Sequence, residues 1–402
     1  MGGIVIIGAG QAGASLAAKL RTLGHEDPIT LIGEEPVPPY QRPPLSKGYL
    51  LGEMELERLY LRAPSFWEDQ DVTLHLGAQV TAIDRTARTV RVAGESISYD
   101  QLALTTGSQP RRLPAAIGGD LPGIFTVRTL ADVDAMAPEF RAGRRLLIVG
   151  GGYIGLEAAA VGAKLGLHVT LIEMAPRILQ RVAAPETSDY FRQVHEGHGV
   201  RIKENTGLDR LNGEGHVSTA TLSDGSEMVV DFVIVGVGIT PATLLAEEAG
   251  LEIENGIRTD AFGRTSDPHV WAAGDCASFP HRGGRIRLES VGNAIDQAET
   301  VAENMLGAAK PYEAKPWFWS DQYDVKLQIA GLNTGYDRVI TRRGDGGAIS
   351  FWYYKDDTLL ALDAMNDARS YMIGKRLIEA GRSPEPSVIA DPSADLKALL
   401  KA

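Results

Sequence analysis

The chain has 402 residues, of which 45 are glycine and one is cysteine, and its formal net charge is −12. This length suggests two or three domains. Proline (21 residues) and hydrophobic content (44%) are ordinary, so the high glycine count indicates glycines at specific turns. One cysteine excludes a disulfide scaffold, a CxxC redox pair and a cysteine-ligated metal centre, and the negative charge argues against nucleic-acid binding.

The first predicted elements are a strand, a glycine-rich turn, a helix and a second strand. Apolar runs at 4–7 and 29–32 predict the strands. The helix between them is expected to carry Leu16, Leu20 and Leu23 on one face. The turn before the helix contains Gly8, Gly10, Ala12 and Gly13, and two acids, Glu34 and Glu35, follow the second strand.

The same order of elements returns in the middle of the chain. An apolar run at 146–149 leads into the turn 150–155, an alanine-rich helix follows, and the run 168–172 ends at Glu173. Short, continuously apolar strands are typical of a parallel sheet covered on both faces. The predicted fold is therefore α/β, with two Rossmann-like units.

Each glycine turn follows a predicted strand, opens a predicted helix and precedes an acid by roughly 20 residues, which is the arrangement that binds dinucleotides. Glycines let the backbone approach a pyrophosphate, helix amides bind it, and the acid binds a ribose hydroxyl. Two such turns predict FAD and a nicotinamide cofactor that exchange hydride. Glu173 favours NADH because a carboxylate repels a 2′-phosphate, whereas the nearby Arg177 and Arg181 argue the other way.

The last part of the chain differs in character from residue 315 on. Alternating apolar strands are predicted at 325–329, 350–354 and 358–362, a helix at 370–380, and a short surface helix in the final segment 391–402. This pattern predicts a separate α+β domain. No stretch is long and apolar enough to span a membrane, so we expect no membrane contact and a cytoplasmic protein.

Several longer motifs give the sequence a family resemblance. It resembles the oxygenase-coupled NADH–ferredoxin reductases, in the branch of the putidaredoxin reductases. The motifs are PYQRPPLSK at 39–47, GGGYIGLE at 150–157, TSDPHVWAAGDC at 265–276, RLESVGNAIDQA at 287–298 and PWFWSDQY at 316–323. The resemblance implies a glutathione-reductase-type architecture with a discontinuous FAD-binding domain (1–111 and 237–314), an NAD-binding domain (112–236) and a C-terminal α+β domain (315–402).

The resemblance also implies roles for individual residues. For FAD, it implies Gly8, Gly10, Ala12, Gly13, Glu34 with Glu35 as the fallback, Arg42, Lys47, Val80, Thr106, Gly107, Arg128, Asp275, Val291 and Trp319. For NADH, we assign Gly150, Gly152, Tyr153, Ile154, Gly155, Glu157, Glu173, Arg181 and Gly238. Lys47 and Glu157 are the candidate catalytic residues, expected to form an ion pair beside the nicotinamide.

The single cysteine bears on the route of the electrons. Related peroxidases and oxidases carry a reactive cysteine where this chain reads Ser46-Lys47-Gly48, and Cys276 lies in a different motif. Without a sulfur relay, electrons are expected to leave the flavin directly, one at a time, for a [2Fe–2S] ferredoxin that docks transiently by charge. Candidate docking residues are Arg62, Arg285, Arg287, Lys326, Arg342 and Arg343.

Alternatives remain open for the electron acceptor. The ferredoxin is expected to feed a bacterial haem-thiolate monooxygenase. The alternatives are the reductase component of a Rieske dioxygenase system and a rubredoxin reductase. A redox-sensing protein like the apoptosis-inducing factors is a further alternative, disfavoured by the charge of −12. We expect a monomer, with no bound metal.

Overall fold

The computed structural model describes residues 2–401, and its contacts divide the chain into two compact units. The first unit comprises the chain up to Gln41, Glu55–Gln109 and Ile239–Pro316, and the second comprises Arg42–Met54, Pro110–Gly238 and the chain from Trp317 on. Each unit is discontinuous in sequence, so residues far apart along the chain meet within it.

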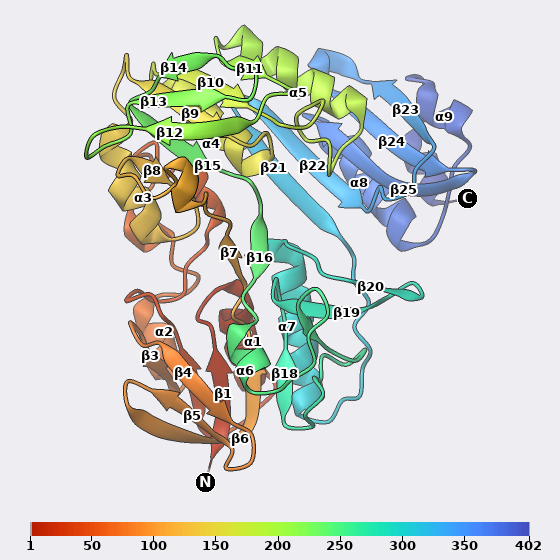
Figure 1. Cartoon of the computed structure of the whole chain (residues 1–402). Helices are drawn as coiled ribbons and strands as arrows, with labels where there is room; N and C mark the ends of the chain where they lie inside the picture. The colour runs from red at the N-terminus through yellow and green to blue at the C-terminus, as the bar shows by residue number, and fades with distance from the viewer. Residues whose placement is uncertain (1, 402) are drawn as a thin grey trace. The chain divides into compact units, whose positions relative to one another are not determined.

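The first unit is built on a seven-stranded sheet (Figure 1). Its order is β3-β2-β1-β6-β5-β4, with β18 also pairing with β6. The strands are β1 (Gly3–Ile7), β2 (Ile29–Ile32), β3 (Val72–His75), β4 (Val80–Asp84), β5 (Thr89–Val92), β6 (Glu95–Leu104) and β18 (Val270–Ala272). The pairs among β1, β2, β3, β6 and β18 are parallel, whereas β4, β5 and β6 form an antiparallel meander.

Two helices pack together on one face of this sheet, α1 (Gln11–Thr22) and α7 (Val291–Met305). Leu16 and Leu20 are fully buried in their shared core. The expectation for Leu23 is wrong: the helix ends at Thr22, and Leu23 is 43% exposed.

Smaller elements complete the unit: α2 (Pro64–Asp69), α6 (Leu244–Glu248), the sheet of β17 (Ile257–Arg258), β19 (Ala277–His281) and β20 (Gly284–Ile286), and the pair β7 (Ser108–Pro110) and β16 (Ile239–Pro241).

The second unit contains a parallel five-stranded sheet in the order β11-β10-β9-β15-β8. Its strands are β8 (Ile124–Phe125), β9 (Arg145–Val149), β10 (His168–Ile172), β11 (Arg201–Lys203) and β15 (Phe232–Val235). Its helices are α3 (Leu130–Met136), α4 (Tyr153–Lys164) and α5 (Pro185–Gly197), and β12 (Leu208–Asn212), β13 (Thr219–Leu222) and β14 (Glu227–Val229) form a small antiparallel sheet. Residues 146–149 of β9 and all of β15 are buried, as expected of a sheet covered on both faces.

The C-terminal part of the second unit is an antiparallel sheet with helices on one side (Figure 1). The order is β21-β22-β25-β24-β23, formed by β21 (Trp317–Gln322), β22 (Val325–Gly331), β23 (Arg338–Arg343), β24 (Ile349–Lys355) and β25 (Thr358–Met365). Helix α8 (Ala368–Glu379) packs on β22 and β25, and α9 (Pro386–Ala390) packs on β23. The mixed α/β fold class and the C-terminal α+β domain are thus confirmed.

The chain end differs from the short surface helix expected there. Residues Leu396–Leu400 form a 3-10 turn, and Leu396 is buried in the core of the C-terminal domain. Burial of Leu396 and of the leucines after it against this core outweighs the preference of the charged residues in this segment for solvent. Residue 402 of the expected helix lies outside the described part of the chain.

Candidate functional site

The first glycine turn joins β1 to α1, and each of its glycines meets a different requirement. Gly8 has φ +112°, a backbone conformation that favours glycine. A Cβ on Gly13 would lie 2.0 Å from the Gly8 carbonyl oxygen, so the close approach of helix and strand requires glycine. A Cβ on Gly10 would meet nothing within 4 Å, and no side chain caps the helix that starts beside it.

The second glycine turn joins β9 to α4 and repeats this geometry. Gly150 has φ +110°, a Cβ on Gly155 would lie 2.2 Å from the Gly150 oxygen, and a Cβ on Gly152 would meet nothing within 4 Å. Helix α4 also starts without a side-chain cap. In both turns, open space lies beside the middle glycine at exposed helix amides, which is the arrangement that accepts a pyrophosphate. Both turns therefore fit a dinucleotide.

The acids after the second strands differ between the two turns. Gly8 N donates to Ile32 O, and Gly150 N donates in the same way to Ile172 O, so Gly33 and Glu173 hold equivalent positions. A Cβ on Gly33 would lie 2.7 Å from the Ala9 Cβ, which explains why the first acid stands one residue later. Glu34 is exposed, whereas Glu35 accepts a hydrogen bond from the Tyr40 hydroxyl (2.6 Å).

Glu173 is held against its own glycine turn. Its Oε2 accepts a hydrogen bond from Gly151 N and its Oε1 one from Ala175 N, both at 2.8 Å. Of the two nearby arginines, Arg177 donates to Ser188 Oγ (2.6 Å), and Arg181 lies near Gly238, whose built Cβ would be 3.5 Å from Arg181 Nη1. An acid and an arginine thus both lie near the edge of the sheet where β9, β10 and β15 end.

Other predicted residues of the first unit gather at the carboxyl edge of its sheet. Ile7 and Ala272 both pair with Leu104, so the segments after β1, β6 and β18 leave the sheet side by side. Thr106 and Gly107 follow β6, and Asp275 follows β18, where its carboxylate accepts from Ser108 Oγ (3.0 Å). Val291 begins α7, and Val80 is buried in the same apolar cluster as Ile7.

The second unit contains a buried ion pair formed by the two candidate catalytic residues. Lys47 Nζ donates to Glu157 Oε2 at 2.7 Å, and the Glu157 side chain is 2% exposed. Ser46 Oγ donates to the same carboxylate oxygen (2.6 Å), and Ser320 Oγ donates to Oε1 (2.7 Å). Three donors on one carboxylate compensate the charge for its removal from water. Lys47, from the proline-rich segment, and Glu157, from α4, are thus brought together over 110 positions of sequence.

Sequence reasoning missed the two serines of this cluster. Ser46 lies in the 3-10 turn Pro43–Ser46, and Ser320 lies in the aromatic strand β21, and both are buried. A serine directly after three aromatic residues is the only signal that the sequence offered for Ser320.

The remaining residues predicted for the flavin and nicotinamide lie at other points of the second unit. Arg42 Nη1 donates to the backbone oxygen of Arg128 (2.7 Å). Tyr153 is partly buried and its ring lies 5.0 Å from that of Phe318, whereas Ile154 is 43% exposed. Burial also raises the pKa of the Tyr153 hydroxyl.

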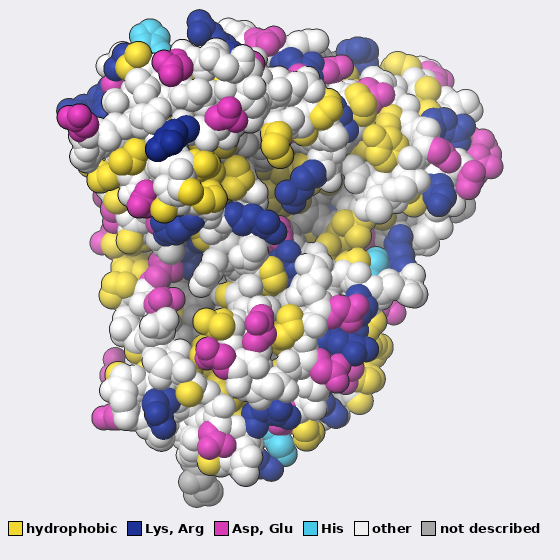
Figure 2. Space-filling view, in the orientation of Figure 1, with side chains coloured by type: hydrophobic (Ala, Val, Ile, Leu, Met, Phe, Trp, Pro, Cys, Tyr) yellow, Lys and Arg dark blue, Asp and Glu magenta, His cyan; other side chains and the backbone are white. Residues whose placement is uncertain are grey.

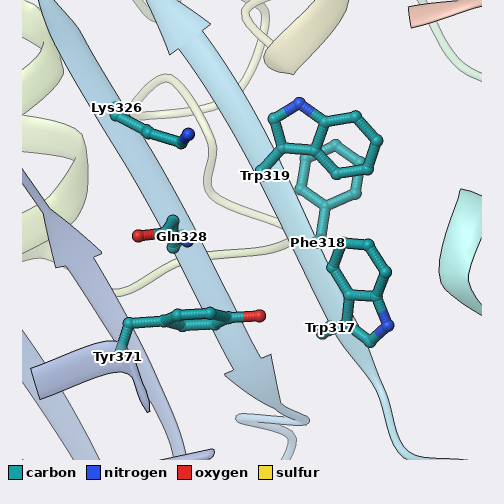
Figure 3. A pocket seen from close by; sticks show the side chains of 6 residues that line it. All are labelled: Trp317, Phe318, Trp319, Lys326, Gln328 and Tyr371. Atoms are coloured by element: carbon teal, nitrogen blue, oxygen red, sulfur yellow. The ribbon is translucent and has the colours of Figure 1, made fainter. Parts of the chain in front are cut away.

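Trp319 belongs to an aromatic pocket on the C-terminal domain (Figure 3). Its ring stacks on Trp317, with centroids 5.5 Å apart and planes 22° apart. The pocket has a volume of about 220 Å³, and its lining is Trp317, Phe318, Trp319, Lys326, Gln328 and Tyr371. Figure 3 shows the Lys326 ammonium pointing toward Trp319 across the two strands.

Three of the candidate docking arginines, Arg285, Arg287 and Arg342, are engaged in hydrogen bonds within the fold, and their role in docking stays a prediction. Arg342 is 8% exposed and donates to the backbone oxygens of Ile389, Asp391, Pro392 and Ala394. Arg285 donates to the backbone oxygens of Thr259 and Ser278. Arg62, Lys326 and Arg343 are exposed. Figure 2 shows basic and acidic side chains interspersed on the face in view.

Cys276 is fully buried in the apolar core of the first unit. Its Sγ lies 3.4 Å from both Leu104 O and Ala273 O, and burial raises the pKa of the thiol. Within residues 2–401, no group of three or more metal-ligating side chains comes together. No helix in this described range has both the length and the apolar character needed to cross a membrane.

Two Rossmann-type nucleotide sites in one chain, together with a C-terminal α+β domain, define a two-nucleotide oxidoreductase. Residues 2–298 match the pyridine nucleotide-disulphide oxidoreductase family, and residues 317–400 match the reductase C-terminal family. The chain belongs to the pyridine nucleotide-disulphide oxidoreductases, in the branch of the ferredoxin reductases, and is a flavoprotein oxidoreductase. The cofactors of this family are FAD and NAD(P)H.

Similar proteins match over nearly the whole chain. A ferredoxin–NAD(P)(+) reductase from a Sphingomonas species is 46% identical, over 98% of this chain and 96% of the relative. Putidaredoxin reductase from Pseudomonas putida is 40% identical, over 99% of this chain and 97% of the relative. The reductase in the crystal structure of the covalent putidaredoxin reductase–putidaredoxin complex superposes with a TM-score of 0.96 at 39% identity, covering 100% of this chain and 98% of that one.

Proposed function

We propose that the protein is an NADH-dependent ferredoxin reductase that passes electrons, one at a time, to a [2Fe–2S] ferredoxin of a bacterial haem-thiolate monooxygenase. The observation that carries this proposal is the repeated glycine geometry, with open space beside Gly10 and Gly152 at two uncapped helices. FAD, when bound, accepts a hydride and releases two single electrons, so the chain has to bind, orient and shield the cofactors.

The proposed FAD site in the first unit uses Gly10 and the amides of α1 for the pyrophosphate. Glu34 is proposed to bind the adenosine ribose, because its side chain is exposed whereas Glu35 bonds Tyr40. Asp275 is proposed for the ribityl chain, since its carboxylate lies at the same sheet edge and is oriented by Ser108. The flavin roles of Val80, Thr106, Gly107 and Val291, and those of Arg42, Lys47, Arg128 and Trp319, rest on the resemblance and stay predictions.

The proposed nucleotide of the second turn is NADH. The Glu173 carboxylate is anchored at the end of β10 by two backbone amides, where a 2′-phosphate would meet its negative charge. Arg181, near Gly238, is the group that would favour NADPH, so the preference depends on the balance between these two side chains.

The Lys47–Glu157 pair is proposed to act on the nicotinamide. Three donors use part of the acceptor capacity of the carboxylate, and Glu157 Oε1 receives only the hydroxyl of Ser320. A carboxylate oxygen accepts two hydrogen bonds, so Oε1 has capacity for an N–H of the carboxamide. The pair would orient the ring without any protein group acting as a base.

A ferredoxin is the proposed electron acceptor because the chain has no sulfur relay. Cys276 is its only cysteine and is buried among backbone oxygens. The solved relative in complex with putidaredoxin supports a ferredoxin partner. Docking is proposed to be transient and electrostatic, through exposed basic residues such as Arg62, Lys326 and Arg343.

Rapid mixing of the FAD-loaded protein with NADH or NADPH, followed by a panel of acceptors, tests the proposal. We expect faster flavin bleaching with NADH and faster turnover with a monooxygenase-type [2Fe–2S] ferredoxin than with a Rieske-system ferredoxin or a rubredoxin. Preference for the Rieske-system ferredoxin or for rubredoxin would assign the chain to one of those systems. Fast bleaching without delivery to any acceptor would favour a redox-sensing protein and contradict the proposal.

A further inference from the structure

A chain of buried polar side chains leads away from Glu157 between strand β21 and helix α5. Ser320 Oγ donates to Glu157 Oε1 (2.7 Å), and Gln322 Nε2 donates to Ser320 Oγ (3.1 Å). His195 Nε2 lies 2.8 Å from Gln322 Oε1, and the Tyr323 hydroxyl lies 3.0 Å from His195 Nδ1. The three middle members, Ser320, Gln322 and His195, are fully buried, whereas Tyr323 is only partly buried.

The alternation of strand β21 brings this chain together. Successive side chains of a strand point to opposite faces, so Phe318, Ser320 and Gln322 share one face and Trp317 and Trp319 share the other. Phe318 packs on Tyr153 of α4, Ser320 reaches Glu157 of the same helix, and Gln322 reaches His195 of α5. One face of β21 thus contacts the nucleotide-binding part of the second unit throughout its length.

The charge on Glu157 determines the direction of every hydrogen bond in the chain. A carboxylate paired with Lys47 can only accept, so the single hydroxyl proton of Ser320 must point to Glu157. Ser320 Oγ must then accept from Gln322, which turns the amide nitrogen of Gln322 to Ser320 and its oxygen to His195.

The same reasoning fixes the proton on the imidazole. Gln322 Oε1 can only accept, so Nε2 of His195 carries the hydrogen, and Nδ1 of the neutral ring accepts from Tyr323. Burial lowers the pKa of His195 to about 4, so the ring is neutral at pH 7 as this pattern requires. All four bonds therefore donate toward Glu157.

We propose that Ser320, Gln322 and His195 are positioning residues that aim the Glu157 carboxylate, so that Oε2 stays on Lys47 while Oε1 faces the nicotinamide site. This inference rests on the proposed role of Glu157. Loss of an inner member of the chain frees Ser320 or the carboxylate to rotate, which misplaces the acceptor and slows flavin reduction by NADH. The outermost group, the Tyr323 hydroxyl, matters least because three other bonds still define the geometry.

The first test needs no activity measurement. Nitrogen-15 NMR of the histidine-labelled holoprotein, with His195 assigned by comparison with His195→Asn, reports which ring nitrogen carries the hydrogen. We expect the Nε2–H tautomer at pH 7 and a ring that stays neutral at pH 5.5. An Nδ1–H tautomer, or a cationic ring at pH 7, would overturn the proposed direction of the chain.

The second test asks whether Gln322 acts through Glu157. Gln322→Leu is expected to slow flavin reduction by NADH by roughly 10-fold, the size expected for the loss of one hydrogen bond. In a Glu157→Gln background the same substitution is expected to have little further effect, because residues that act through one another are not additive. An equal slowing in both backgrounds, or none in the wild-type chain, would refute a positioning role.

Two controls separate this proposal from a folding defect and from the function proposed above. Ser350→Ala removes another buried serine hydroxyl of the C-terminal domain, which contacts Asp367 and Trp352, and should leave the rate unchanged. Tyr323→Phe should slow reduction by less than Gln322→Leu does. If Glu157→Gln alone leaves the rate unchanged, the proposed role of Glu157 fails, whereas the His195 tautomer still reports whether the chain of hydrogen bonds exists.

Discussion

At the residue scale, buried carboxylates of this chain differ in how their charge is compensated. Glu157 faces the Lys47 ammonium and two serine hydroxyls, whereas Asp363, on β25, faces only the hydroxyls of Tyr353 and Thr187. Neutral donors compensate a buried charge less than an ammonium does. Asp363 is therefore expected to respond to pH.

Asp363 should make stability depend on pH. Burial raises the pKa of its carboxyl from 3.8 to about 6, although Thr187 and Tyr353 act in the opposite direction. The folded chain then binds a proton that the unfolded chain has released, so this contribution is present below pH 4 and is lost as pH rises through 6. The difference corresponds to roughly 3 kcal/mol.

Asp363→Asn isolates this contribution, because His195, whose pKa is lowered, stays in both proteins and opposes the trend. We expect the thermal midpoint of the wild-type protein to fall relative to that of the variant between pH 4 and pH 7. Parallel midpoints across this range would show that Asp363 keeps an ordinary pKa in the folded chain.

Glu173 should govern the choice between NADH and NADPH. Glu173→Ala removes the negative charge and two hydrogen bonds to backbone amides, so we expect NADH binding to weaken by roughly 10-fold and the preference over NADPH to shrink. Titration of both nucleotides against the FAD-loaded protein measures this. Glu173→Gln, which removes the charge but keeps one hydrogen-bond acceptor, is the matched control. An unchanged preference for NADH over NADPH in both variants would show that another residue binds the ribose.

At the scale of elements, the three glycines of each strand–turn–helix unit have different structural roles. Gly8 and Gly150 make the turn, Gly10 and Gly152 leave open space, and Gly13 and Gly155 let the helix pack on the strand. Gly152 has φ −82° and ψ 177°, which alanine adopts without strain. Substitutions of Gly152 and of Gly155, three residues apart, are therefore expected to have different effects.

Gly152→Ala should leave the fold intact and weaken NADH binding, because the new methyl group enters only the space proposed for the pyrophosphate. Gly155→Ala should lower stability by about 1–3 kcal/mol, because its methyl group meets the Gly150 oxygen. Thermal midpoints and NADH titrations of the two variants distinguish these outcomes. A large loss of stability in Gly152→Ala would contradict the presence of open space beside this glycine.

At the scale of the whole molecule, the route of the electrons follows from which groups the fold leaves accessible. The only thiol is buried in the core of the first unit, among Leu104 and Ala273, where burial raises its pKa. A neutral, buried thiol neither attacks nor relays. We therefore expect the acceptor to take electrons from the flavin itself.

Cys276→Ala should therefore leave electron transfer intact. We expect steady-state turnover with the ferredoxin to stay within about twofold of wild type, while stability falls by roughly 1 kcal/mol through loss of the sulfur from the core. A collapse of turnover with FAD content and thermal midpoint preserved would indicate that sulfur takes part after all.

Features determined by local backbone requirements were predictable from the sequence. The strands before each glycine turn, the helices after them and the acids beyond were expected where the structure has them, because glycine, helix periodicity and strand length act over a few residues. Leu23 and the final segment departed from expectation because helix termination and core contacts overrode a periodic pattern.

What only the tertiary structure decided is which distant side chains meet. The cluster on Glu157 joins Ser46, Lys47 and Ser320 over 110 to 163 positions, and the polar chain adds His195 from yet another element. Nothing in the local composition of these segments signals the others, since a hydrogen bond between distant residues has no sequence period. The two glycine turns by themselves predicted dinucleotide cofactors and the single cysteine excluded a cysteine pair, whereas the fold decided which side chains meet at the site that is proposed to orient the reaction.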